Sequence, residues 1–352
     1  MKGSQVAAIA FVLLADGSIF AATDPNVIWT GNFDDGVASL SGHCSAGENG
    51  WCGKQIIRLQ QIQLVSDRGF QGHGLAARFE VKFGDVYAGY SDSRSLITPS
   101  FSMWEDEGNE RWYRWQAMWP DGWVGDYPKW DQLSTPTARS HGGWIVHWHH
   151  DANGAVETGS APLYIGANNA NIFMCLVDQT TSACRETLTL ATLLREHWHD
   201  FVMHAKWSSD PNVGFLEMWI DGVNVLPMHR TSNKYSGMRN YLVVGLYRNG
   251  HIGDPNLLFP DGTHVYGTDG APGVAYLDGF IAGKTRAAVE APTPAPPPSS
   301  SDAGPSTPQV AITSPTSFAG GSSCASSGSP TALLLVTAIA ALVLRRRRRT
   351  AR

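Results

Sequence analysis

The sequence predicts an all-β sandwich with one short helical piece. Between Asn26 and Arg286 the apolar residues stand in short alternating runs, which glycine, asparagine and aspartate separate. This pattern is typical of antiparallel strands joined by tight turns. Tryptophan occurs 13 times, and such large side chains suit the space between two packed sheets. We therefore expect about a dozen strands in a two-sheet jelly roll.

The clearest early strand is LAARFEVKFG, residues 75–84. Side chains alternate across a strand, so Phe79 and Val81 share one face while Arg78 and Glu80 share the other. We expect the first face to lie in the core and the second to meet water or a ligand.

Two later segments, FVMHAKW at 201–207 and FLEMWI at 215–220, alternate in the same way. Asp221-Gly222 directly after them is a hairpin turn signal. Only the stretch from Leu188 to His197 suggests a helix, so the helical content is predicted to be minor.

The N-terminal residues 1–22 have the order of a secretory signal peptide. Lys2 precedes an apolar run, and small residues around Ala21 and Ala22 follow it. The alternative is a first core element. With the signal peptide removed, residues 23–286 form the predicted folded domain.

Residues 287–329 are rich in proline, serine and alanine, a composition that cannot bury enough surface to fold and predicts a linker. Residues 330–352 combine a short apolar segment with a block of arginines, which favours membrane contact and a cytoplasmic end. This tail resembles the C-terminal sorting tails of myxobacterial surface proteins. The resemblance implies that export and sorting machinery acts on the chain and that Cys324 is processed or lipid-modified; the alternative is a permanent single-pass anchor. Either way, we expect an exported protein at the cell surface or outer membrane, or released from it.

The four remaining cysteines fit an oxidising compartment. Cys44 and Cys52 are close in sequence, as are Cys175 and Cys184, so two local disulfides are the simplest pairing among the possible connectivities. The net charge is −5 although the tail is basic, so the folded body is acidic. That balance argues against nucleic acid as a partner.

Six tryptophans fall within residues 104–130. We expect about half of them to be core and half to line a cleft, since sugar rings stack on exposed aromatic faces. Trp119 and Trp123 are assigned to the second group.

The segment WIVHWHHD, residues 144–151, carries the most chemistry. In a strand His147 and His149 project from one face. The pair suits proton transfer and polar recognition near neutral pH. Two alternatives stay open, namely a structural pair and a metal site, although the sequence offers no third ligand.

These segments resemble the jelly-roll polysaccharide lyases, which include alginate, glucuronan and heparin lyases. An Arg-x-Glu strand with a substrate-binding arginine is matched by Arg78 and Glu80. A Gln-hydrophobic-His strand is matched by His147 and His149, with histidine in place of glutamine.

A third motif of that family, Tyr-Phe-Lys-x-Gly-x-Tyr, is matched from Tyr241 to Tyr247, with Val243 in place of lysine. Residues 198–222 also resemble a structural hairpin of the heparin-lyase-like branch. The resemblance implies a concanavalin-like jelly roll and a lyase that acts on an acidic polysaccharide without a cofactor or metal. The replaced lysine and glutamine imply a changed substrate or a lost activity.

Breaking a uronic-acid polymer by β-elimination needs positive charge at the sugar carboxylate, a base for the C5 proton and an acid for the departing O4. We assign Arg78 and His147 to the carboxylate, His149 to the base and Tyr247 to the acid, with Tyr247 in both roles as a variant. These four residues are expected to converge on one face of one sheet. The predicted substrate-binding residues are Glu80, Tyr241, Trp119, Trp123 and Arg94.

Two other functions remain open from the sequence. A non-catalytic, lectin-like surface protein uses the same fold. A glycoside hydrolase needs two carboxylates that flank the bond, and the acidic run from Glu105 to Glu107 is its only candidate.

Overall fold

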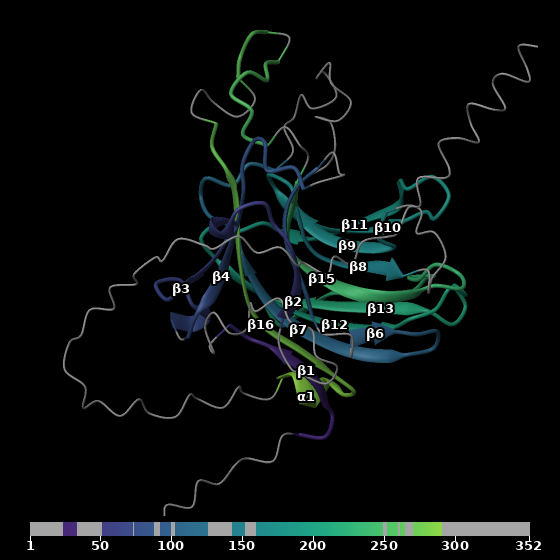
Figure 1. The fold of residues 1–352 in the computed structure, drawn as a ribbon. Coiled ribbons are helices and arrows are strands. Elements are labelled where there is room, and N and C mark those ends of the chain that lie inside the picture. Colours follow the sequence, from purple (N-terminus) through teal and green to yellow (C-terminus); the bar gives the residue numbers. More distant parts are fainter. Residues whose placement is uncertain are drawn as a thin grey trace, which may run out of the picture.

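The computed structural model describes residues 24–33, 51–72, 74–87, 92–99, 103–125, 143–151, 160–248, 252–259, 261–264 and 270–290. These residues form two antiparallel sheets whose inner faces share one core (Figure 1). The predicted all-β jelly-roll sandwich is confirmed.

The strands of the first sheet are β1 (Val27–Gly31), β3 (Ile62–Val65), β4 (Ala76–Val81), β7 (Glu110–Met118), β12 (Trp198–Lys206), β13 (Phe215–Ile220), β14 (Val223–Arg230) and β16 (Gly273–Gly283). Their order is β14-β13-β12-β7-β16-β4-β3, and β1 pairs with β16. The strands of the second sheet are β2 (Trp51–Gln55), β5 (Ser93–Pro99), β6 (Trp104–Glu105), β8 (Trp144–Asp151), β9 (Leu163–Ala167), β10 (Asn171–Val177), β11 (Cys184–Thr192) and β15 (Arg239–Arg248). Their order is β11-β10-β9-β8-β15-β5-β2, and β6 pairs with β15.

Aromatic rings from both sheets fill the space between them. Trp115 of β7 stacks on Phe201 and Phe280 at centroid distances of 5.0 and 6.1 Å. Trp148 of β8 meets Trp115 edge-on from the second sheet, at 6.3 Å. Phe79 of β4 is also fully buried, as its alternation predicted. Burying such rings is the main favourable contribution to folding here.

The helix predicted from Leu188 to His197 is wrong. Its first part belongs to β11, where Leu188 pairs with Met174 of β10. Apolar residues at these spacings suit either structure in isolation, and the partner strand decides between them. Within the described ranges the helical pieces are η2 (Leu59–Gln61), η3 (Phe70–Gly72) and α1 (Arg286–Glu290).

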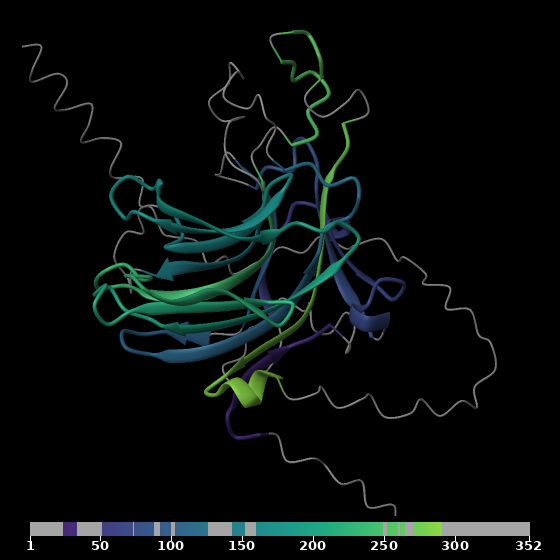
Figure 2. The ribbon, with the colours of Figure 1, turned by 180° about the vertical axis from the view of Figure 1, so that it is seen from behind.

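The first and last described elements meet. Figure 2 shows β1 and α1 side by side at the bottom of the sandwich, and the backbone N–H of Lys284 donates to the carbonyl of Asn26 at 2.8 Å. Ala288 and Val289 of α1 are buried, so these two residues of the predicted linker pack on the domain.

The disulfide between Cys175 and Cys184 is confirmed; it joins β10 to β11 with a Cα separation of 5.6 Å. In the described part of the chain, no helix has the length and apolar character needed to cross a bilayer. The predicted signal peptide, Cys44, Trp130, Cys324 and the C-terminal tail lie outside the described residues.

Candidate active site

The neighbouring strands β8 and β15 bring the predicted histidines and tyrosines together. Tyr241 lies opposite His149, and Val243 lies opposite His147. Their intervening neighbours, such as Trp148, point into the core between the sheets. Because side chains alternate along a strand, these histidines and tyrosines occupy the other face of the second sheet. We call this surface the site face; as shown below, it also carries Arg94 and Tyr247.

Three aromatic rings form a stack across the site face. Tyr247 of β15 stacks on Trp144 of β8 at 4.5 Å and 11°, and Trp144 stacks on Tyr164 of β9 at 3.8 Å and 17°. The hydroxyl of Tyr164 contacts Sγ of Cys184 at 2.9 Å. The disulfide to Cys175 therefore braces the far end of the stack.

A bulge between β15 and β8 sets Trp144 opposite Tyr247. The register of the two strands shifts between Val244 and Tyr247, and such a bulge changes which side chains lie opposite each other. Gly245 lies in this bulge with φ of 131°, and a Cβ there would clash with the carbonyl oxygen of Ser95. Glycine is therefore required for strand packing at this position.

Arg94 of β5 lies directly opposite Tyr247. Its Nη2 donates to the Tyr247 hydroxyl at 3.2 Å, and its guanidinium carbon lies 4.6 Å from the ring centroid. Its Nη1 donates to Oε1 of Gln55 at 3.0 Å. The Tyr247 hydroxyl in turn donates to Oδ2 of Asp92 at 2.6 Å, so one short segment before β5 supplies a carboxylate and β5 a cation to the same phenol.

The prediction that Arg78 and Glu80 join His147 is wrong. Both residues lie on β4 in the first sheet. Their neighbour Phe79 points into the core, so Arg78 projects from the opposite surface of the sandwich, where it donates to Glu80 at 2.6 Å. The arginine that contacts Tyr247 on the site face is Arg94.

His149 is held in the tautomer that a base needs. Its Nδ1 lies 3.0 Å from the carbonyl of His150; a carbonyl only accepts, so Nδ1 carries the proton and Nε2 keeps its lone pair. Burial lowers the pKa of His149, and Arg94 lowers it further, while the bond to His150 opposes both effects. The imidazole is therefore neutral at pH 7.

His147 is neutral for a similar reason. Burial lowers its pKa well below the usual histidine value, and His149 and Arg94 add to this effect. Its Nδ1 is buried and has no hydrogen-bond partner among the described residues. Burial also raises the pKa of Tyr247; the Asp92 carboxylate adds to that rise and Arg94 opposes it. The phenol therefore keeps its proton at neutral pH.

The two tryptophans predicted to bind substrate are core residues. Trp119 and Trp123 are 0% and 2% exposed, and they pack edge-on against each other at 6.3 Å. Tyr241 does reach the site face, where its ring lies 5.5 Å from His149. Glu105, which the hydrolase alternative needed at the surface, is 1% exposed and accepts a hydrogen bond from Tyr113 in the core.

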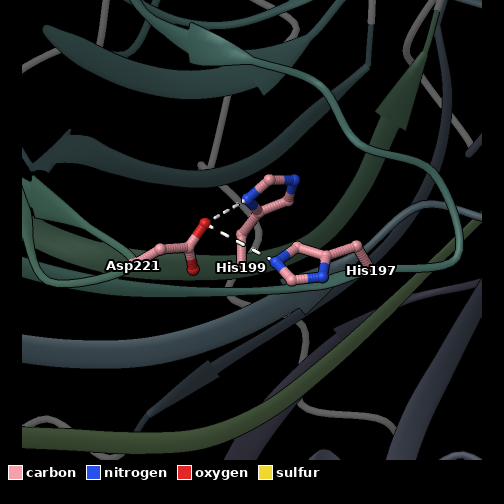
Figure 3. Close-up of side chains that lie close together, drawn as sticks. All are labelled: His197, His199 and Asp221. Carbon is pink, nitrogen blue, oxygen red and sulfur yellow. Dashed lines mark hydrogen bonds and ion pairs between the residues drawn. The ribbon is translucent and has the colours of Figure 1, made fainter.

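One group of side chains in the described ranges, His197, His199 and Asp221, has its ligand atoms within 4.8 Å of one another (Figure 3). Nε2 of His199 accepts the backbone N–H of Leu194 at 3.2 Å, so Nδ1 carries the proton that bonds Oδ2 of Asp221 at 2.8 Å. A metal at Nδ1 would remove that proton and put one on Nε2, against the Leu194 donor. The group fits a structural hydrogen-bond network on the first sheet.

Sequence reasoning missed Asp92, Gln55 and Tyr164, and gave no role to Trp144. The segment SDSRS offered one usable signal, because Asp92 and Arg94 stand two residues apart and so share a face in a strand. Gln55 and Tyr164 had no signal, because only the pairing of β2 with β5 and of β9 with β8 brings them to the site face.

Three solved structures align with this chain at TM-scores below 0.5. An endo-β-1,4-glucuronan lyase from the fungus Trichoderma reesei aligns with a TM-score of 0.49 and 19% identity, over 68% of this chain and 94% of that one. A GH131 β-glucanase catalytic domain from Podospora anserina gives 0.43 and 13%, over 74% and 96%. An alginate lyase from Chlorella virus gives 0.38 and 10%, over 74% and 100%.

Among curated proteins no sequence matches this chain. A family model described as polysaccharide lyase matches residues 39–278. That region contains all of the site face, from Gln55 to Tyr247. Because the match spans more than half of the sequence, the chain belongs to the polysaccharide lyase family.

Proposed function

We propose that this polysaccharide lyase cleaves a uronic-acid-containing polysaccharide by β-elimination on the site face. The observation that carries the proposal is the 3.0 Å contact between Nδ1 of His149 and the carbonyl oxygen of His150. The His149 Nδ1–H is bound to a backbone carbonyl, which leaves a basic Nε2 on the same face as a protonated Tyr247 and a cationic Arg94. A base, an acid and a positive charge on one surface are what the elimination requires.

Arg94 and His147 are suited to the sugar carboxylate. The C5 proton is weakly acidic until the adjacent carboxylate is neutralised, and a guanidinium binds carboxylates through paired hydrogen bonds. Arg94 and His147 lie on either side of Tyr247, the first directly opposite it on β5 and the second 6.4 Å from its ring on β8. As a neutral imidazole, His147 carries one ring N–H that can donate a hydrogen bond.

The proton transfers follow from the two pKa directions. Nε2 of His149 takes the proton from C5, and the electron pair of that bond forms the C4–C5 double bond. The C4–O4 bond breaks with its electrons on O4, and the Tyr247 hydroxyl gives its proton to O4. His149 ends as imidazolium and Tyr247 as phenolate, and transfer of one proton through solvent from the first to the second restores both.

We infer an acidic substrate because Arg94 places a positive charge on the site face, next to the Tyr247 hydroxyl. The body as a whole is acidic, so Arg94 has no support from a broad positive field. Recognition must therefore come from this local charge and from the ring of Tyr241, which belongs to the same face.

The test uses the absorbance of the unsaturated product. The purified chain is incubated with alginate, glucuronan, heparin-type and pectic polymers, and the ultraviolet absorbance is followed. We expect a rise with at least one polymer and a loss of roughly 100-fold or more in His149→Ala and Tyr247→Phe. Binding without a rise, or new reducing ends without absorbance, would contradict elimination.

Two matched controls separate chemistry from folding. His197→Ala removes an exposed histidine directly before β12, and Tyr276→Phe removes a hydroxyl on β16 of the first sheet. Both variants are expected to keep the activity of the unaltered chain. An equal loss in either control would point to a folding defect rather than to the site face.

We also propose that the enzyme works at the cell surface, held by its C-terminal tail. Support comes from the disulfide between Cys175 and Cys184, a bond typical of exported proteins. The test is cell fractionation of the full chain and of Cys324→Ala. We expect the full chain in the surface fraction and the Cys324→Ala variant released or in another fraction. A full chain found in the cytoplasm would contradict the proposal.

A further inference from the structure

We propose that Asp92 is the positioning residue that commits Tyr247 to the acid step, by holding the phenolic proton until O4 of the leaving sugar accepts it. This inference rests on the proposed elimination and goes beyond it, because the acid and base roles of Tyr247 are otherwise interchangeable. The geometry that carries it is the 2.6 Å hydrogen bond from the Tyr247 hydroxyl to Oδ2 of Asp92.

The ring of Tyr247 is held from both sides. Arg94 of β5 covers it at 4.6 Å, and Trp144 of β8 stacks on it at 4.5 Å. Because β15 lies between β5 and β8, these two contacts leave the ring little freedom to turn. The position of the hydroxyl oxygen is therefore fixed, and only the direction of its hydrogen can change.

Two charged groups compete at that oxygen. Arg94 Nη2 donates to it at 3.2 Å and so favours the ionised phenolate. The Asp92 carboxylate accepts its proton and so favours the neutral phenol. His147, 6.4 Å away on β8, is the remaining titratable side chain in ring contact with Tyr247 among the described residues, and it is neutral.

The balance decides the order of proton transfer. With Asp92 ionised, a phenolate would place two negative charges within hydrogen-bond distance, so Tyr247 begins the cycle protonated and cannot act as the base. The base is then His149. Once O4 develops negative charge, the phenolic proton of Tyr247 leaves its hydrogen bond to Asp92 and moves to O4. Arg94 stabilises the phenolate that remains.

The pH profile of Asp92→Asn tests this assignment. Removing the negative charge makes the phenol easier to ionise, so the basic limb of the kcat profile should move to lower pH by about one unit, while the acidic limb stays in place. A basic limb that does not move would overturn the proposal. A rate that increases at neutral pH would overturn it too, since ionised Tyr247 would then be the base.

A second measurement does not need turnover. Tyrosine labelled with ¹³C at Cζ is titrated by NMR in the full chain and in Asp92→Asn, and the Tyr247 signal is identified with Tyr247→Phe. We expect the signal to change at lower pH in the variant; identical titrations would overturn the proposal. Asp67→Asn is the matched control, because Asp67 is exposed in the turn after β3 of the first sheet. This variant should change neither the pH profile of kcat nor the NMR titration of Tyr247.

The two readouts also separate this inference from the function it rests on. If no polymer yields an unsaturated product, the elimination fails while the NMR titration still reports on Asp92. If product forms and the titrations are identical, the elimination stands and the role of Asp92 fails.

Discussion

Tyr247 and Trp144 lie face to face across β15 and β8, with ring centroids 4.5 Å apart and planes 11° from parallel. Trp144 in turn rests on Tyr164, whose hydroxyl contacts the disulfide sulfur of Cys184. The orientation of the proposed acid is therefore supported by a chain of contacts that ends at a covalent link between two strands. Rigid support of this kind is what holds a reacting group in position.

Trp144→Ala is predicted to lower kcat more than it raises KM. Without the indole, the Tyr247 ring loses one of its two supports, and a displacement of about 1 Å costs roughly 10- to 100-fold in rate. Steady-state kinetics on the preferred polymer checks the split. Trp112→Ala is the control, since Trp112 stacks on His204 in the first sheet; an equal loss of kcat there would assign the effect to general stability.

Arg94 and Arg78 should differ sharply in their effect on activity. Arg94→Gln removes the cation beside Tyr247, and we expect kcat/KM to fall by roughly 100-fold or more, because a neutral amide cannot balance the sugar carboxylate. Arg78→Gln changes the far surface, and less than about a two-fold effect is expected. Thermal melts of both variants show whether each is folded. Activity lost only in Arg78→Gln would place the substrate on the first sheet.

The contrast between these arginines shows what an alternating sequence pattern can predict and what it cannot. The run from Leu75 to Gly84 has a clear period of two, and its residues Ala76–Val81 form β4 with the predicted faces. The period cannot tell which sheet the strand joins, because that depends on pairing with β16 and β3, far away in sequence. Arg78 was therefore assigned to the right strand face and the wrong sheet.

The sequence did not reveal the strand β5 or the importance of its Arg94, for the opposite reason. Its residues are buried on both faces, so the segment from Ser93 to Pro99 lacks the alternation of a half-exposed strand. Arg94 was consequently given only a secondary role. By contrast, His147, His149 and Tyr247 were predicted correctly to share a face, because their strands alternate and happen to be neighbours.

The acidic limb of the kcat/KM profile should lie below pH 6.5. A base works in its neutral form, and a lowered pKa keeps His149 neutral to lower pH than the ordinary histidine value of 6.5. His147, whose pKa is lowered as well, stays neutral over the same range. Initial rates between about pH 4.5 and 8 measure the limb. A limb at or above pH 6.5 would contradict a buried histidine as the base.

Glu105 predicts a pH dependence of stability that is independent of catalysis. The side chain is 1% exposed, it accepts the Tyr113 hydroxyl at 2.6 Å, and burial raises its pKa from 4.5 to about 7. The folded chain therefore holds a proton between these two values that the unfolded chain has lost. The free energy of unfolding should fall as pH rises from about 4.5 to about 7, by up to roughly 3 kcal/mol.

Glu105→Gln removes this dependence, because an amide can accept the same hydrogen bond from Tyr113 and does not titrate. Urea unfolding at pH 5 and pH 8 measures it: the unaltered chain should lose more stability between the two values than the variant does. Glu290→Gln, at an exposed site on α1, is the control and should behave as the unaltered chain. Equal losses in the unaltered chain and Glu105→Gln would mean that Glu105 is ionised in the core, paired with Arg111 at 3.4 Å.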